Sequence, residues 1–136
     1  PDWISLLVEQ AQRESIGAVG VRLLYKNETI QHAGVIIGLR GIAGHPFVGF
    51  YKNETGYFNY LKSVNNFSAV TAACLMVRKN CFDEVNGFCE DLALEFNDVD
   101  FCLKLKEKGY GKNKEIPTLV LAGASLDDVF AITIFD

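Results

Sequence analysis

The chain has 136 residues, of which 49% are hydrophobic and 22% are charged, and its formal net charge is -4. This length and composition are typical of one globular domain, or part of one, and exclude an intrinsically disordered chain. The negative charge gives no reason to expect nucleic acid as a partner, because phosphate binding favours a basic face. No segment has the charged start, apolar middle and small-residue cleavage site of a signal peptide.

The four cysteines, Cys74, Cys81, Cys89 and Cys102, contain no C-x-x-C pair, and both histidines lie far upstream of them. Cys74 and Cys102 fall within apolar patterns, where a reduced cysteine behaves as a small hydrophobic residue. The pattern therefore predicts reduced, structural thiols, with neither disulfides nor a metal site.

The first half of the chain predicts one helix followed by short strands. In "PDWISLLVEQAQRE" (1–14), Pro1 suits a first helical turn and one face carries Trp3, Ile4, Leu7, Val8 and Ala11. The run "IGAVGVRLLY" (16–25) is typical of a buried strand, and "TIQHAGVIIGL" (29–39) of one or two short strands. Residues 40–66 are rich in glycine and aromatic residues and predict a long irregular loop.

The second half opens with the strongest strand signal in the chain. "SAVTAACLMVRK" (68–79) is apolar on both faces and predicts a central strand of a covered sheet. A short helix should follow, capped by Asn80 and ended by the Asn86-Gly87 pair.

A second helix is predicted by "EFNDVDFCLKLKEKGY" (95–110), with Asn97 as its N-cap and glycine after its last turn. At 100° per residue, one broad face carries Val99, Phe101, Cys102, Leu103 and Leu105, and the opposite face carries Asp100, Lys104, Glu107 and Lys108. Asp100 has a complete structural explanation, because it lies in the first turn and can pair with Lys104 four residues on.

Asp98 differs from Asp100 because it falls on the apolar side, between Leu105 and Cys102. A carboxylate there needs a cleft, a partner or a ligand, unless it only accepts hydrogen bonds from nearby backbone N–H groups. Both interpretations stay open from the pattern alone. A metal-binding D-x-D is a weaker alternative, because residues two apart on a helix point in different directions.

Taken in order, several segments resemble the C-terminal half of family 2 glycosyltransferases, which are inverting enzymes of the GT-A fold. The residues that carry the resemblance are "PDWISLL", "VGVRLLYKNETIQHAGVIIGL", "GIAGHPF", "NFSAVTAACLMVRKNCFDEVNGFCEDL" and "FNDVDFCLKLKEKGY". The resemblance covers residues 1–112 and implies an α/β fold: part of a three-layer GT-A domain, with a mixed sheet and flanking helices.

In that family an acidic motif at the start of the helix supplies the catalytic base, and here it reads Asn97-Asp98. The resemblance therefore implies that Asp98 deprotonates an acceptor hydroxyl as it attacks the anomeric carbon of a nucleotide sugar, with inversion. It also implies that the segments around Thr71 and "GFCED" (87–91) line the acceptor side. Glu90 and Asp91 are candidates there, with an exposed acidic turn as the alternative.

His45, in "AGHPF", lies in the predicted loop and is a candidate contact for sugar or phosphate. A loop histidine without functional contacts is the alternative.

In the family, the nucleotide sugar and a divalent metal, Mg or Mn, are held by an N-terminal half that ends in a D-x-D shortly before the counterpart of "PDW". We therefore expect no metal in this chain, no sugar transfer by it alone, and self-association through surface that the other half would cover. The resemblance also implies a cytoplasmic location, at the membrane surface in many cases, and a glycan or other hydroxyl acceptor.

Residues 113–136 depart from the family pattern, because no histidine follows position 45. The segment weakly resembles a sodium/proton antiporter helix, but Asp127 and Asp128 are costly at the centre of a membrane span. The alternatives are a fusion join, a membrane segment, or a divergent finish packed on the same domain. We favour the last, with "TLVLAG" as a strand and "SLDDVFAITIF" as a helix capped by Ser125.

Two further interpretations of function remain open at this point. The chain can be a non-catalytic binding or interaction module on the same scaffold, or a truncated or chimeric product.

Overall fold

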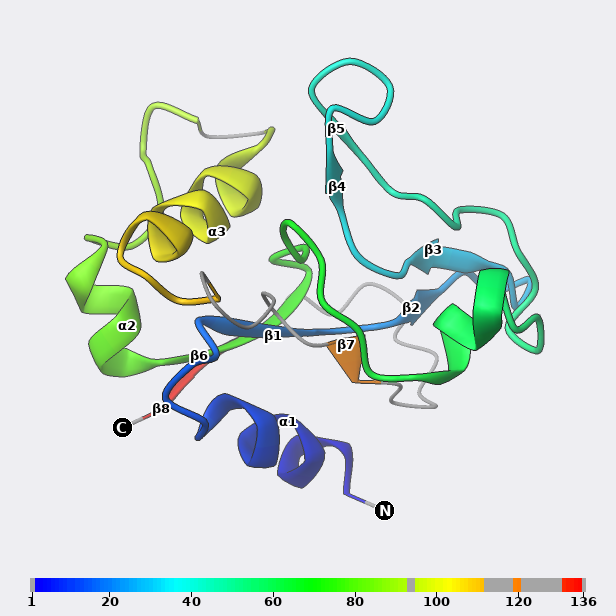
Figure 1. Ribbon diagram of the computed structural model, residues 1–136, viewed down its shortest axis with the longest axis horizontal. Coiled ribbons are helices and arrows are strands. Elements are labelled where there is room, and N and C mark those ends of the chain that lie inside the picture. The colour runs from blue at the N-terminus through cyan, green and yellow to red at the C-terminus, as the bar shows by residue number, and fades with distance from the viewer. Residues whose placement is uncertain (1, 93–94, 112–118, 121–130, 136) are drawn as a thin grey trace.

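The computed structural model describes residues 2–92, 95–111, 119–120 and 131–135. Its main sheet has four strands in the order β7-β1-β6-β8 (Figure 1), namely Leu119–Val120, Ala18–Val21, Cys74–Arg78 and Ala131–Phe135. The central pair, β1 and β6, is antiparallel, whereas β7 on β1 and β8 on β6 are parallel. The chain is therefore a mixed α/β structure, as the sequence predicts.

Helices cover both faces of this sheet, so the predicted layered arrangement is present. Successive residues of β6 point to opposite faces. Leu75 and Val77 pack with α2 and α3 (Lys79–Glu84 and Asn97–Glu107), whereas Cys74 and Met76 pack with α1 (Trp3–Ala11). This explains why β6 is apolar from Cys74 to Val77: these four residues are buried on both faces of the strand, and only the half-buried Arg78 at its end is charged.

The first helix begins after Asp2, whose side chain accepts a hydrogen bond from the Ile4 N–H at 3.1 Å. Leu7 and Ala11 are buried as predicted, with Trp3 and Val8 packed beside them. The prediction is wrong for Ile4, which is exposed, while Leu6 joins the packed side instead. The predicted role of Pro1 lies outside the described residues.

The predicted strand 68–79 is shortened to Cys74–Arg78. Residues 68–73 precede it as an irregular segment, in which Ala69 forms an isolated β-bridge with Val35. The reason is local, because the backbone N–H groups of Thr71 and Ala72 donate to side chains and are not free for a ladder. The segment from Val70 to Ala73 thus uses its backbone N–H groups to bind the side chains of His32 and Asp98.

Both predicted helix caps are displaced. The α2 helix begins at Lys79, so Asn80 lies inside it. The α3 helix begins at Asn97 itself, after Phe96 in the left-handed conformation, and the Asn97 Oδ1 accepts from the Cys89 N–H at 3.0 Å. Its amide therefore holds the 87–92 segment against α3, and cannot be counted as an N-cap.

The buried face of α3 consists of Val99, Phe101, Cys102 and Leu105. Leu103, predicted on that face, is exposed because it lies at the edge of the apolar arc. The predicted ion pair between Asp100 and Lys104 is present at 2.7 Å.

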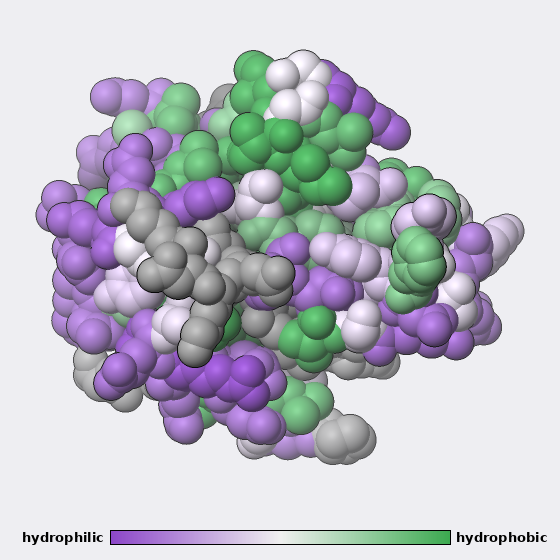
Figure 2. All heavy atoms as spheres, viewed as in Figure 1, coloured by the Kyte–Doolittle hydropathy of each residue, from purple (hydrophilic) through white to green (hydrophobic). Residues whose placement is uncertain are grey.

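Two small antiparallel ribbons lie beside the main sheet. Strand β2 (Leu23–Leu24) pairs with β3 (Ile30–His32), and β4 (Ile36–Ile37) pairs with β5 (Ala43–Gly44). Strand β5 and a kinked 3₁₀ segment, Tyr57–Lys62, interrupt the region 40–66 that the sequence predicts as loop. Apolar side chains gather over the β4–β5 hairpin in Figure 2, and Ile36, Ile37 and Ile42 are exposed there.

The end of the chain contributes two strands. Strand β7 falls inside the predicted strand "TLVLAG". The predicted helix 125–135 is wrong for Ala131–Phe135, which forms β8 along the free edge of β6, where its β-branched residues suit a pleated strand. Ser125, Asp127 and Asp128 lie outside the described residues.

Within the described ranges, no helix is long and apolar enough to cross a membrane.

Gly20, in β1, leaves no room for a side chain, because a Cβ there would lie 2.6 Å from the Cβ of Val70. Replacement of Gly20 by alanine must therefore separate β1 from the Val70 segment. We expect Gly20→Ala to lower the free energy of unfolding by about 1–3 kcal/mol.

The measurement is urea denaturation followed by circular dichroism. Gln31→Ala, at an exposed position of β3, is the control and should change stability by less than about 0.5 kcal/mol. Equal midpoints for Gly20→Ala and the unchanged chain would contradict this packing.

Candidate functional site

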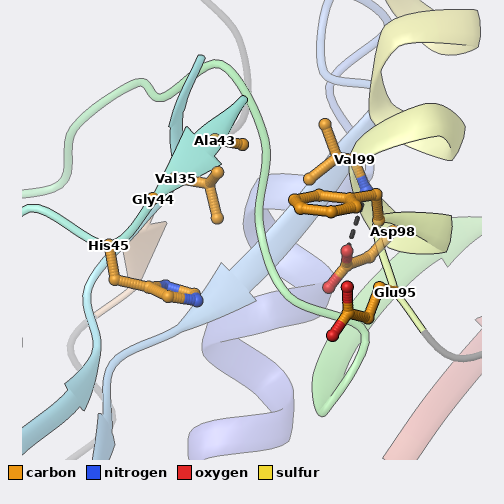
Figure 3. A pocket seen from close by; sticks show the side chains of 8 residues that line it. Val35, Ala43, Gly44, His45, Glu95, Asp98 and Val99 are labelled. Carbon is orange, nitrogen blue, oxygen red and sulfur yellow. Dashed lines mark hydrogen bonds between the residues drawn. The ribbon is translucent and has the colours of Figure 1, made fainter. Parts of the chain in front are cut away.

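A pocket of about 320 Å³ opens between the β4–β5 hairpin and the start of α3. One wall comes from the hairpin side, and the other from the first turn of the helix and the residues before it (Figure 3). The lining residues are Val35, Ala43, Gly44, His45, Glu95, Phe96, Asp98 and Val99. The pocket therefore brings together His45 and Asp98, two of the residues that the sequence singles out.

Asp98 is the second residue of α3, and both of its carboxylate oxygens accept backbone hydrogen bonds. Oδ2 accepts from the Ala72 N–H at 3.0 Å, and Oδ1 accepts from the Val99 N–H at 2.9 Å. A position in the first helical turn also favours negative charge. Asp98 thus has the backbone bonds of the structural interpretation and the cavity that the functional one requires.

His45 faces Asp98 across the pocket. Its ring extends inward from the hairpin side in Figure 3, opposite the carboxyl groups of Asp98 and Glu95. Behind it lies His32, and the two Nδ1 atoms are 2.9 Å apart. A partner in the protein therefore orients His45.

His32, in β3, is 1% exposed and is the buried polar side chain among the described core residues. Its Nε2 lies 3.3 Å from the Gly34 nitrogen and 3.4 Å from the Thr71 nitrogen, and it accepts hydrogen bonds from both N–H groups. Burial, reinforced by the neighbouring His45, lowers the pKa of His32 to about 3. The ring is therefore neutral at ordinary pH.

The segment before β6 links the two walls. Thr71 and Ala72 are consecutive, and the N–H of the first bonds to His32 while the N–H of the second bonds to Asp98. The Thr71 hydroxyl is itself used, since its oxygen accepts from the Ala73 N–H at 3.3 Å. Thr71 therefore supports the site through its backbone, and its side chain does not line the pocket.

The other predicted acceptor-side residues lie away from the pocket wall. Glu90 and Asp91 are exposed in a turn, and the Asn97 amide bonds to the Cys89 backbone. Three residues near the site went unnoticed in the sequence: His32, Glu95 and Phe96. A histidine at an inward position of a strand was the available signal for His32, whereas nothing in the pattern marked Glu95 or Phe96.

The four cysteines are free, and Cys102 lies beneath the site with its Sγ 3.8 Å from the Val70 carbonyl oxygen. Burial raises the pKa of the Cys102 thiol to about 12, so the group is a buried neutral thiol.

The residues do not fit a metal ion in this part of the chain. Asp98 and Asp100 diverge, because Asp98 bonds to the Ala72 backbone while Asp100 pairs with Lys104. No group of three histidine, cysteine or acidic residues within the described ranges is placed to hold a metal. The carboxylates of Asp98 and Asp100 therefore have different partners and do not meet at one point.

Comparison with known proteins gives two long matches. The chain is 49% identical over 111 residues, 81% of its length, to the uncharacterized protein y4gI of Sinorhizobium fredii. It is 39% identical over 110 residues, 80% of its length, to the O-antigen biosynthesis protein RfbC of Myxococcus xanthus. These matches cover 12% and 9% of the relatives, so the chain spans about a tenth of their length.

A short match, 47% identical over 38 residues, is to sodium/hydrogen exchanger 9B1 of Homo sapiens, and it covers 28% of this chain and 7% of the exchanger. No family model matches the chain, and no solved structure is significantly similar to it.

The match to RfbC includes the pocket. A match that covers 80% of a chain of 136 residues spans the middle of the chain wherever it begins. His32, His45 and Asp98 therefore all lie in the shared segment.

The lowered pKa of His32 predicts a loss of stability in acid. The unfolded chain binds a proton on His32 near pH 6.5, whereas the folded chain excludes it down to about pH 3. Stability contributed by neutral His32 is therefore complete above pH 6.5 and falls as the pH drops below it. Between pH 7 and pH 5 the loss should be about 2 kcal/mol.

Urea denaturation at the two pH values measures this loss. In His32→Gln the difference between pH 7 and pH 5 should shrink, whereas His45→Gln, which keeps the buried ring, should retain most of it. An unchanged difference in His32→Gln would refute the assignment.

Proposed function

We propose that the chain is the acceptor-side portion of an inverting family 2 glycosyltransferase of the GT-A fold that acts in polysaccharide biosynthesis. The observation that carries the proposal is the Asp98 carboxylate, fixed at the mouth of α3 and lining a pocket. The similarity to a protein named for O-antigen biosynthesis supports it, as does the mixed sheet covered by helices on both faces.

In this mechanism Asp98 is the general base. Each of its oxygens already accepts one backbone N–H and keeps a second lone-pair direction for a substrate hydroxyl. The Ala72 N–H fixes the direction of the carboxylate, and the first turn of α3 stabilises its charge. An acceptor hydroxyl bound in the pocket would lose its proton to Asp98 as its oxygen attacks the anomeric carbon.

In this proposal the donor nucleotide sugar and its divalent metal are bound by the N-terminal half that the resemblance implies, where the metal would neutralise the leaving diphosphate. The aspartates of the D-V-D sequence have different partners, and this part of the chain is given the acceptor side. The acceptor is proposed to be a glycan hydroxyl.

The test uses a chimera in which residues 1–110 replace the matching segment of RfbC in a Myxococcus xanthus strain that lacks RfbC. O-antigen is read as a ladder on a gel. Asp98→Asn should abolish the ladder, because loss of a general base typically lowers the rate of the catalysed reaction by about 10²–10⁴-fold. Asparagine keeps an oxygen that can accept the Ala72 N–H, so the fold should survive.

Asp100→Asn is the matched control, since Asp100 lies two residues away in the same helix turn and pairs with Lys104 on the surface. It should leave the ladder intact. The residue of RfbC that aligns with Asp98 is replaced by asparagine in parallel, so that the result does not depend on folding of the chimera. A full ladder in both Asp98-type variants would favour a non-catalytic binding module.

A further inference from the structure

The two histidines of the site form a pair whose proton positions are set by the backbone. The His32 Nε2 accepts from the N–H groups of Gly34 and Thr71. A ring nitrogen that accepts hydrogen bonds carries no proton, and a neutral imidazole has only one. The proton of His32 is therefore on Nδ1.

This position determines the state of His45. The two Nδ1 atoms are 2.9 Å apart, which is a hydrogen bond and requires one N–H and one lone pair. Since His32 supplies the N–H, the Nδ1 of His45 must accept. The single proton of a neutral His45 is then on Nε2, the nitrogen on the far side of the ring.

The pair is held in a fixed geometry. The rings meet edge to face, with centroids 4.9 Å apart and planes at 81°. Gly34 adopts a φ of +98°, and a Cβ there would lie 2.2 Å from the Phe67 ring, so its N–H can approach His32 only because the residue is glycine. If the proton of His32 were on Nε2 instead, that N–H would face the backbone N–H groups of Gly34 and Thr71, and none of the three would have an acceptor there.

We propose that His32 is a positioning residue that holds His45 with its Nε2–H available to a ligand in the pocket. The pocket then presents an N–H donor on the hairpin wall and the carboxylate acceptors of Asp98 and Glu95 on the helix wall. Such a pocket suits a neutral ligand bearing several hydroxyl groups, because a hydroxyl both accepts and donates. The identification of that ligand as the acceptor glycan rests on the proposed function. The positions of the protons on the two histidines follow from the hydrogen bonds alone.

The test is a long-range ¹H–¹⁵N correlation spectrum of the ¹⁵N-labelled full chain at pH 7, which separates protonated from unprotonated ring nitrogens. We expect His32 to be protonated on Nδ1 and His45 on Nε2. His45→Gln removes one set of signals and so assigns them.

In His32→Leu, whose side chain has no N–H group to donate, the restraint on His45 is lost, and its two nitrogens should shift toward the averaged values of a mixed tautomer. Gln31→Ala, next to His32 but exposed, should leave the His45 signals unchanged. A structural role for His32 alone would not move these signals.

The proposal is overturned if His45 in the unchanged chain is protonated on Nδ1 or is mixed, or if His45 stays on Nε2 in folded His32→Leu. Should His32→Leu fail to fold, the spectrum of the unchanged chain decides alone. Because no sugar is involved, this result is independent of the O-antigen test of Asp98.

Discussion

The site depends on two neighbouring backbone N–H groups. Those of Thr71 and Ala72 bond to His32 on one side and to Asp98 on the other. Two consecutive peptide groups are joined by covalent bonds, so the distance between their N–H groups varies little. The two walls of the pocket, each bonded to one of these groups, are therefore held at a nearly constant separation. The irregular backbone before β6 is thus the part that links the two walls, and a longer strand there would have removed one hydrogen bond from each side chain.

The sheet holds this segment in place. Strand β6 lies at the centre of the structure between β1 and β8, and both of its faces are covered by helices. The segment before β6 is therefore joined to a fully packed strand. Its Val70 side chain also packs against Gly20 of β1. A site supported in this way is expected to be stiffer than one carried by a free loop.

The pocket also combines two different kinds of polar group. Asp98 is at the start of a helix, where its charge is stabilised. His45 is oriented by the buried, neutral His32. A donor and an acceptor on opposite walls fit the proposed binding of a sugar hydroxyl near a base, and the similarity to RfbC extends over all three residues.

The apolar pattern of 68–79 and the helical period of 95–110 were enough to predict a central strand and an amphipathic helix, because local periodicity indicates which side meets the core. The bounds were not predicted, since the strand is Cys74–Arg78 and the helix is Asn97–Glu107. The same period placed Asp98 on the inner side of the helix. By itself it left open whether the carboxylate meets backbone or a cavity, and the structure shows both.

The tertiary structure alone decided the partners of the polar groups. His32 and His45 are thirteen residues apart and meet only because β3 and the segment after β5 come together. The strand at 131–135, predicted as helix, was likewise decided by the free edge of β6. Hydrogen bonds between distant segments leave no periodic pattern in the sequence. The sequence by itself therefore determined which strand and helix faces are buried, whereas only the tertiary structure decided which polar side chains meet in the site.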